Sequence, residues 1–131
     1  MASFSILVTA LLAQVPQPLL AGRWINASRS VIVKIAPCPD QGFCGTVEWS
    51  SDEAAADAAR AGTINLVGTE ILHGFVPSGA NRWEGRLFVP DLNKKSRAEL
   101  RLVASDRLRV FGCVVGRLIC KSQMWTRLEP P

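Results

Sequence analysis

Short segments in which apolar and polar side chains alternate follow one another along most of this chain. The clearest are 82–89 and 97–104, where every second residue is apolar and those between are mostly charged. Turn-forming residues separate segments at 78–81, 91–94 and 105–106, gaps too short for the crossover that a parallel strand pair needs. The sequence therefore predicts an all-β antiparallel meander in one domain, its sheet either closed on itself or packed on one side. Further strands are expected at 30–35, 45–50, 68–75 and 108–115.

One stretch, 50–62, departs from this alternation. It is rich in alanine, has Ser50 and Glu53 at the spacing of a capping box, and ends at Gly62. These features predict a short helix between two strands. It could be a lid over a barrel mouth or a plain surface connection. Because its apolar face is only alanine, the pattern slightly favours the surface connection.

Four cysteines occur as two close pairs, Cys38 with Cys44 and Cys113 with Cys120. An even number in a small domain indicates disulfides, which persist in oxidising compartments. A zinc knuckle usually takes cysteines two to four residues apart, and a redox motif takes Cys-x-x-Cys. Both spacings here are wider, so structural disulfides are the preferred interpretation.

Turn geometry favours pairing within each close pair. A two-residue turn at Gly116-Arg117 sets Cys113 opposite Cys120, and a three-residue loop over 40–42 sets Cys38 opposite Cys44. Opposed Cβ atoms lie about 4.5–5.5 Å apart, which a disulfide can bridge. Each local loop contributes about 2.4 kcal/mol in the chain-entropy model, against about 4.5 kcal/mol for crossed pairing. Stability alone favours crossed pairing, but the turn register favours the local pairs, and we give the register more weight.

Gly112 stands where strict alternation would place Leu108 and Val110 on the face opposite Cys113 and Met124. A β-bulge at Gly112 would bring all of them to one side. We expect such a bulge there.

Residues 1–22 contain no charged side chain. The apolar run from Phe4 to Ala13 has the length of a signal-peptide core and is too short to span a membrane. Cleavage is expected near Ala13, with Ala21 as a second option, although no Lys or Arg precedes the run. The alternative is a buried N-terminal strand or helix. We expect a leader over 1–21 and a folded domain over 22–131, located in the periplasm or secreted.

The sequence offers little that points to catalysis. His73 is the only histidine and lies in an alternating segment, where a hydrogen-bonded structural role is expected. No glycine-rich phosphate loop follows a strand and opens a helix. The formal net charge is +4, but basic residues are scattered among acidic ones, which indicates a solvated surface rather than a nucleic-acid interface. We therefore expect no enzyme activity, no metal, no cofactor and no transmembrane span.

Several motifs between Gly22 and Arg127 resemble one bacterial family. They are Gly22-Arg23-Trp24, "PCPDQGFCGTVEW", "GTEILHGF", "RWEGRLFVPD" and "RVFGCVVGRLICKSQMWTR". The first is similar to the Gly-x-Trp of lipocalins, in which an arginine of the last strand packs across the tryptophan. Together the motifs resemble the domain-of-unknown-function 2147 family of small exported bacterial proteins. The resemblance implies a lipocalin-like (calycin) antiparallel meander barrel of about eight strands with one short helix, and a pair formed by Trp24 and Arg127.

The chain departs from this family after Pro90-Asp91. The family usually has a glycine there followed by Lys-Thr-Tyr, where this chain has Asn93, Lys94, Lys95 and Ser96. Asparagine tolerates the left-handed turn conformation, so the hairpin should form. Loss of the tyrosine implies a different pocket wherever relatives use that ring.

Two functions remain open from the sequence. In one, the protein is a carrier or sensor that holds a small apolar molecule, such as a fatty acid, in the barrel. In the other, the barrel is filled by its own side chains and its outer surface is an interaction module of the cell envelope. Residues expected on the apolar faces, as ligand walls or simply as core, are Trp49, Trp83, Leu87, Leu100, Leu102 and Val110.

Overall fold

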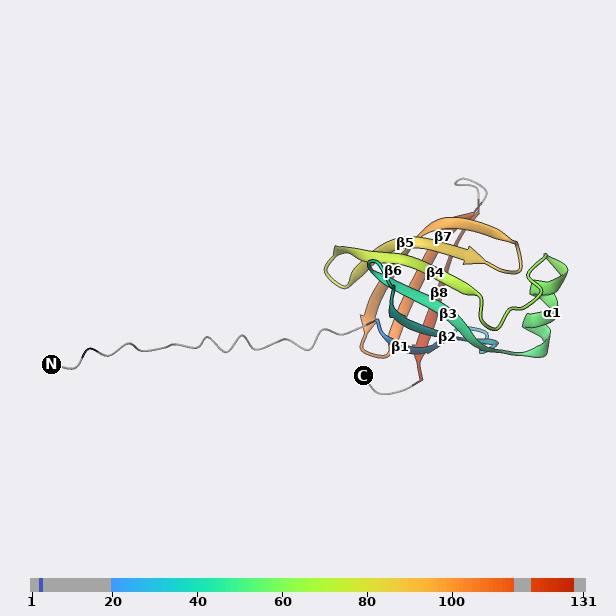
Figure 1. Cartoon of the computed structure of the whole chain (residues 1–131), viewed down its shortest axis with the longest axis horizontal. Coiled ribbons are helices and arrows are strands. Elements are labelled where there is room, and N and C mark those ends of the chain that lie inside the picture. The colour runs from blue at the N-terminus through green and yellow to red at the C-terminus, as the bar shows by residue number, and fades with distance from the viewer. Residues whose placement is uncertain (1–2, 4–19, 115–118, 129–131) are drawn as a thin grey trace.

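Eight strands form a closed antiparallel barrel in the order in which they occur along the chain (Figure 1). The computed structural model describes residue 3 and residues 20–114 and 119–128. Within these ranges the elements are β1 (Gly22–Ile25), β2 (Val31–Pro37), β3 (Phe43–Ser50), α1 (Asp52–Arg60), β4 (Glu70–Gly79), β5 (Arg82–Val89), β6 (Lys94–Ala104), β7 (Arg107–Val114) and β8 (Ile119–Arg127). The predicted antiparallel meander barrel with one short helix is confirmed.

The first and last strands close the barrel by pairing with each other. Trp24 lies opposite Arg127, and Ile25 lies opposite Thr126. Most of the strands have one apolar face, so curling the sheet until β1 meets β8 buries those faces together and leaves no unpaired edge among the described strands.

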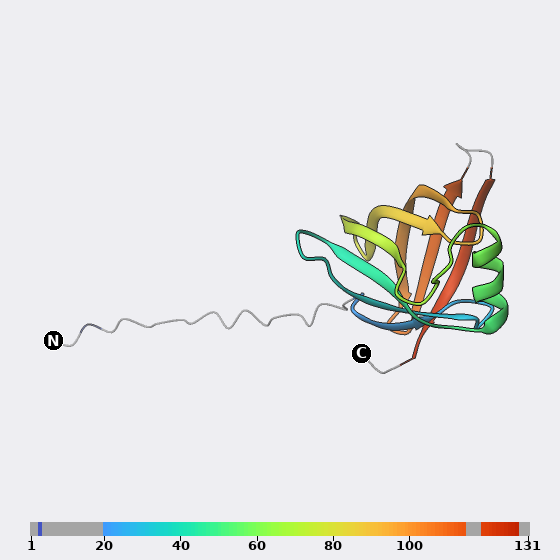
Figure 2. The same ribbon diagram turned by 45° about the vertical axis from the view of Figure 1, so that its right-hand side comes forward.

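The two ends of the barrel differ. Because successive strands reverse direction, connections 26–30, 51–69 and 90–93 gather at one end, which we call the mouth. Connections 38–42 and 105–106 lie at the other, the closed end. Figures 1 and 2 show α1 lying across the mouth. In the described ranges no helix combines the length and apolar character needed to cross a membrane.

Helix α1 begins one residue later than the capping-box pattern predicts. Ser51 is the N-cap, and its Oγ accepts a hydrogen bond from the backbone N–H of Ala54 at 3.1 Å. Ser50 instead ends β3, where it pairs with Val31. The expected cap at Ser50 is therefore wrong, because the strand ladder already uses that residue.

The β2–β3 hairpin also differs from the predicted register. Cys44 lies opposite Ala36, and the backbone N–H of Cys38 donates to the carbonyl of Gly42 at 2.8 Å. The predicted register placed Pro39 in the ladder, but proline has no N–H to donate. The loop therefore centres one residue earlier, and Cys38 lies beyond the last ladder pair.

No bulge occurs at Gly112, contrary to the expectation from the sequence. The β7–β8 ladder runs without a shift from Arg107↔Thr126 to Val114↔Ile119, with Cys113 opposite Cys120 as predicted. Leu108, Val110 and Trp125 are buried inside the barrel, so Cys113 and Met124, at the alternate positions, lie on the outer face. The predicted turn at Gly116-Arg117 lies outside the described residues.

Candidate functional site

The closed end of the barrel is filled by Trp24, Arg127 and the two residues before β1. The guanidinium carbon of Arg127 lies 4.3 Å from the Trp24 ring centroid, and Arg127 is only 8 % exposed. Its Nε donates to the carbonyl of Ser105 at 2.9 Å, and its Nη1 donates to the carbonyl of Ala21 at 2.8 Å. Burial lowers the pKa of Arg127, and the charge of Asp106 partly offsets that effect. The structure thus places Trp24 and Arg127 as the stacked pair that the resemblance implies.

Leu20 and Ala21 belong to this closed end. Leu20 is fully buried, and its carbonyl accepts a hydrogen bond from Nε1 of Trp24 at 2.8 Å. The remainder of the expected leader, apart from residue 3, lies outside the described residues.

A cavity of about 590 Å³ opens at the mouth. Its apolar wall comes from strands on all sides of the barrel, from the loop before β4 and from the inner face of α1. The apolar lining residues are Val31, Val33, Val47, Ala54, Ala58, Leu66, Ile71, Leu87, Phe88, Val89, Pro90, Leu92, Val110 and Trp125. Ala54 and Ala58 are small enough to let the helix lie close over the opening. The helix therefore covers the mouth, as the lid alternative expects, and is not the plain surface connection that the pattern slightly favoured.

A side-chain hydrogen bond ties the segment after α1 to the opposite rim. Oγ1 of Thr63 donates to the carbonyl of Pro90 at 3.2 Å. In the same turn, Asn93 adopts a left-handed conformation (φ 50°), as expected for the residue that replaces the family's glycine. The rim is therefore held by the α1–β4 segment and the β5–β6 turn together.

Two of the six wall residues expected from the sequence line this cavity. They are Leu87 and Val110. Trp83, Leu100 and Leu102 lie outside its lining, and both leucines are buried in the core.

The expectation for Trp49 is wrong. Its side chain is 44 % exposed and does not line the cavity. Ile32 pairs with Trp49 whereas Val33 pairs with Val47, which leaves Glu48 without a partner in the ladder. This bulge shifts the alternation by one residue, so Trp49 turns to the outer face.

The sequence analysis placed no polar residue in the cavity wall, and two that it missed lie on the inner face of β8. Lys121 pairs with Gly112, and Gln123 pairs with Val110. Oε1 of Gln123 accepts a hydrogen bond from Nε1 of Trp125 at 3.3 Å. The alternation of β8 could have revealed them. Side chains at every second position share a face, so Gln123 and Lys121 lie on the inner face with the buried Trp125 and Arg127. The assumed bulge at Gly112 concealed this alternation.

Acidic and hydroxyl side chains complete the rim. Glu53 and Asp57 come from α1, Asp91 from the β5–β6 turn, and Ser28, Ser30 and Ser51 from the neighbouring connections. Asp57 forms an ion pair with Arg60. Lys121 is the only cationic side chain among the described lining residues.

Small residues on β6 and β7 keep the lumen open near Lys121. A Cβ added at Gly112 would lie 3.2 Å from Cδ2 of Leu87 and 3.4 Å from Oγ of Ser96. Ser96 stands where the family has its tyrosine, and its Oγ is buried without a hydrogen-bond partner in the described part of the chain. The serine leaves room beside the cavity that a tyrosine ring would occupy.

Both close cysteine pairs form disulfides. Cys38–Cys44 spans 5.0 Å between Cα atoms and Cys113–Cys120 spans 3.9 Å. The first lies in the β2–β3 hairpin at the closed end, and the second joins β7 to β8 near the mouth.

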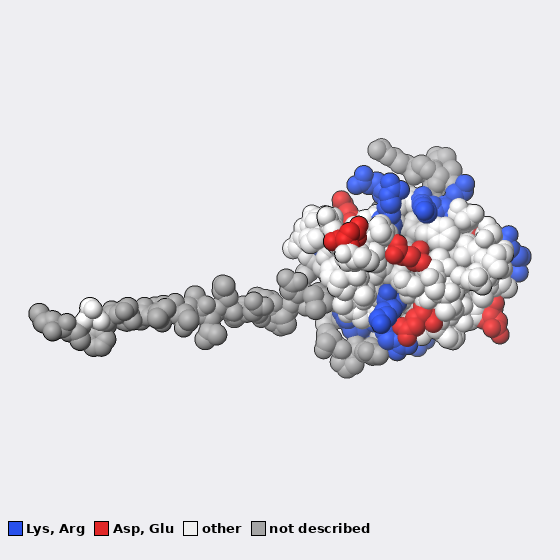
Figure 3. Space-filling model, in the orientation of Figure 1, with Lys and Arg blue, Asp and Glu red and all other residues white. Residues whose placement is uncertain are grey.

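Charged side chains of both signs are interspersed on the face shown in Figure 3. This arrangement agrees with the scattered charges in the sequence.

The barrel, its closed end and its covered mouth define a lipocalin-like protein. Among solved structures, the chain is similar to protein HP1028 of Helicobacter pylori, described as belonging to the lipocalin family, with a TM-score of 0.63 and 12 % sequence identity. The match covers 85 % of this chain and 84 % of that one, and at this identity it shows the fold.

The family profile described as "Uncharacterized protein conserved in bacteria (DUF2147)" matches residues 22–127. This chain belongs to that family, as the motifs indicated. A comparison with curated proteins found no match.

Proposed function

We propose that this protein is a non-catalytic, exported binding protein that holds one small amphiphile of the fatty-acid class in its barrel. The observation that supports this most is the cavity of about 590 Å³ with apolar walls under α1. Pockets for small molecules are typically 300–1,000 Å³, mostly apolar, with a few placed polar groups. A barrel acting only as a packed interaction module has no need for such a space.

The polar residues of the cavity indicate which end of the ligand lies where. An acyl chain contacts the apolar wall formed by Val33, Val47, Ile71 and Val110. Its anionic head group then lies near Lys121, with Gln123 beside it as a hydrogen-bond donor. Glu53, Asp57 and Asp91 on the opposite rim repel an anion, which fixes the head group on the β8 side.

Export is proposed from the two disulfides and the apolar N-terminal run. Both disulfides need an oxidising compartment to persist. Leu20 and Ala21 bond to Trp24 and Arg127, so cleavage after Ala21 would remove part of the closed end. We therefore place the cleavage near Ala13, and intact-mass measurement of periplasmic protein checks it.

The binding proposal is tested by native mass spectrometry and by titration with palmitate, following the tryptophan fluorescence, to which Trp125 in the cavity wall contributes. We expect one palmitate per chain. Gly112→Leu projects a side chain into the lumen and should weaken binding at least tenfold. Arg109→Leu, on the outer face of the same strand, is the matched control and should bind normally. Unaltered binding by Gly112→Leu in a folded protein, or no uptake by the native chain, would overturn the proposal.

The position of the head group has its own pair of variants. Lys121→Gln should weaken palmitate binding more than binding of the uncharged methyl ester. Lys34→Gln removes the same charge from an exposed position between inward-facing Val33 and Ile35, and should affect neither ligand. Equal losses for acid and ester would place the head group elsewhere.

A further inference from the structure

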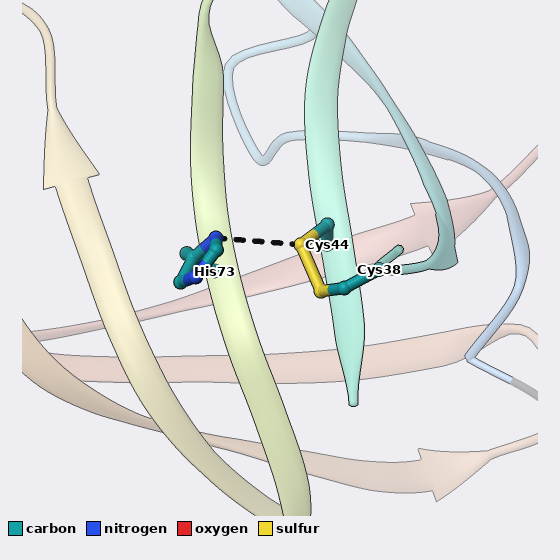
Figure 4. Close-up of side chains that lie close together, drawn as sticks. All are labelled: Cys38, Cys44 and His73. Atoms are coloured by element: carbon teal, nitrogen blue, oxygen red, sulfur yellow. Dashed lines mark hydrogen bonds between the residues drawn. A yellow bond between two sulfur atoms is a disulfide. The ribbon is translucent and has the colours of Figure 1, made fainter. Parts of the chain in front are cut away.

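Outside the cavity, one of the two disulfides lies beside the only histidine of the chain (Figure 4). Nδ1 of His73 is 3.5 Å from Sγ of Cys44 and 2.7 Å from Oε1 of Glu70. The ligand atoms of Cys38, Cys44 and His73 all lie within 4.8 Å of one another. Two sulfurs and an imidazole nitrogen therefore converge on the outer side of the barrel, away from the mouth, and the Glu70 carboxylate lies against the imidazole.

A local irregularity of β4 explains why His73 reaches Cys44. Phe43 pairs with Phe75 and Gly45 pairs with Leu72, so His73 and Gly74 together oppose Cys44. Gly74 has φ +65°, the left-handed conformation that a glycine bulge uses. The bulge lets Leu72 and Phe75 both stay buried while His73 lies on the outer face beside the disulfide.

We propose that reduction of Cys38–Cys44 creates a Zn²⁺ site formed by the two thiolates, Nδ1 of His73 and the carboxylate of Glu70. Tetrahedral zinc with bonds of about 2.3 Å to sulfur and 2.0–2.1 Å to nitrogen separates those ligands by about 3.6 Å. The sulfur–nitrogen distance between Cys44 and His73 is already 3.5 Å. Cysteine spacing alone argues against a zinc knuckle, but the third and fourth ligands come from β4, which that spacing does not reveal.

The redox step balances with a dithiol as reductant. The dithiol gives two electrons and two protons to the Cys38–Cys44 bond and itself becomes a disulfide. Zn²⁺ then binds, and the two new thiols lose their protons to solvent. The oxidised protein therefore cannot bind Zn²⁺ at this position, because the two sulfurs are bonded to each other and provide no thiolate.

Charge and access around the cluster favour a cation. The side chains of His73 and Glu70 are about half exposed, so an ion can approach from solvent. Asp40 in the adjacent β2–β3 hairpin is a further acidic side chain that interacts with His73. Arg86 lies opposite His73 on β5 and is the opposing charge.

The test uses the full chain carrying Cys113→Ser and Cys120→Ser, reduced anaerobically with a dithiol that is then removed. Co²⁺ serves as the spectroscopic probe and Zn²⁺ as its competitor. We expect one Co²⁺ per chain, with thiolate-to-cobalt charge-transfer bands, tetrahedral d–d bands, and displacement by Zn²⁺. The oxidised protein should bind none.

Matched variants assign the ligands. The chain with Cys38→Ser and Cys44→Ser keeps the other two thiols and should lack the tetrahedral spectrum. His73→Gln and Glu70→Gln each remove a ligand, and each should weaken Co²⁺ binding at least tenfold. Equal binding by the two cysteine variants, or no effect of His73→Gln, would overturn the proposal. So would a reduced chain that loses its circular-dichroism signal and does not regain it with Co²⁺.

Discussion

Arg127 combines three interactions in one buried side chain. Its guanidinium stacks on Trp24, and two of its nitrogens donate to the backbone carbonyls of Ser105 and Ala21. The planar group is suited to stacking and to donating in fixed directions at once, whereas an ammonium is a compact point charge. Arg127 therefore links β1, β8 and the β6–β7 turn at the closed end.

We expect Arg127→Lys to lower the free energy of unfolding by about 1–3 kcal/mol, because it keeps the charge but loses stacking and one or both carbonyl contacts. Urea unfolding monitored by tryptophan fluorescence measures the change. Arg109→Lys, made at an exposed position, should change stability little. If both variants unfold at the same urea concentration, the stacked pair contributes nothing measurable.

Single residues show where sequence reasoning succeeds. Trp24 and Arg127 could be placed because a closed meander must bring its first and last strands together. Trp49, Lys121 and Gln123 could not, because one bulge inverts every later side chain of a strand. The bulge at Glu48 was not foreseen, and the one expected at Gly112 does not occur.

Helix α1 has a short apolar face and depends on its N-cap. Oγ of Ser51 accepts from the N–H of Ala54, and Asp52 and Glu53 lie in the first turn, where they interact favourably with the helix dipole. Ala58 is its one buried residue, so packing holds the helix weakly. An element of this kind opens more readily than the strands around it.

We expect Ser51→Ala to destabilise α1 by about 1 kcal/mol. Because α1 covers the mouth, amide exchange over 54–60 should accelerate and bound palmitate should dissociate faster. Hydrogen-exchange mass spectrometry and stopped-flow displacement measure the two effects. Ser50→Ala removes the neighbouring hydroxyl without removing the cap and should change neither rate. Faster exchange without faster release would mean that α1 does not gate the cavity.

The Cys113–Cys120 disulfide is expected to act on stability and not on binding. It closes a loop with a sequence separation of 7, which the chain-entropy model values at about 2.4 kcal/mol. Replacing both cysteines by serine should lower the melting temperature and leave the palmitate dissociation constant unchanged. Equal melting temperatures for the oxidised and reduced native protein would contradict this.

At the level of elements, the two hairpins show the limits of turn rules. The turn predicted at Gly116-Arg117 placed Cys113 opposite Cys120, as observed. No proline interrupts either flanking strand, so every residue there has a backbone N–H to donate to the ladder. At the other hairpin, Pro39 cannot take its predicted place in the ladder, and the register moved. The disulfide forms there nonetheless, because the Cα atoms of Cys38 and Cys44 remain 5.0 Å apart.

For the whole molecule, the sequence determined the topology but not the lumen. Alternation and short turns leave an antiparallel meander as the simplest arrangement, and the structure adopts it. The cavity volume is a small difference between two large volumes, the space that the eight strands enclose and the volume of the side chains that fill it. Here it depends on small residues such as Gly112, Ser96 and Ala58, whose neighbours only the folded barrel defines.

Ligand binding and folding of the barrel are linked, because the cavity exists only in the folded chain. A ligand bound only by the folded state stabilises it by RT ln(1 + [L]/Kd), about 2.7 kcal/mol at one hundred times Kd. Palmitate should therefore raise the melting temperature progressively with concentration. Gly112→Leu should remove that dependence, while its own melting temperature reports the packing of the added side chain against Leu87. Scanning calorimetry at several palmitate concentrations makes the measurement. A melting temperature independent of palmitate in the native protein would show that the cavity does not bind it, and the filled-module hypothesis would then be preferred.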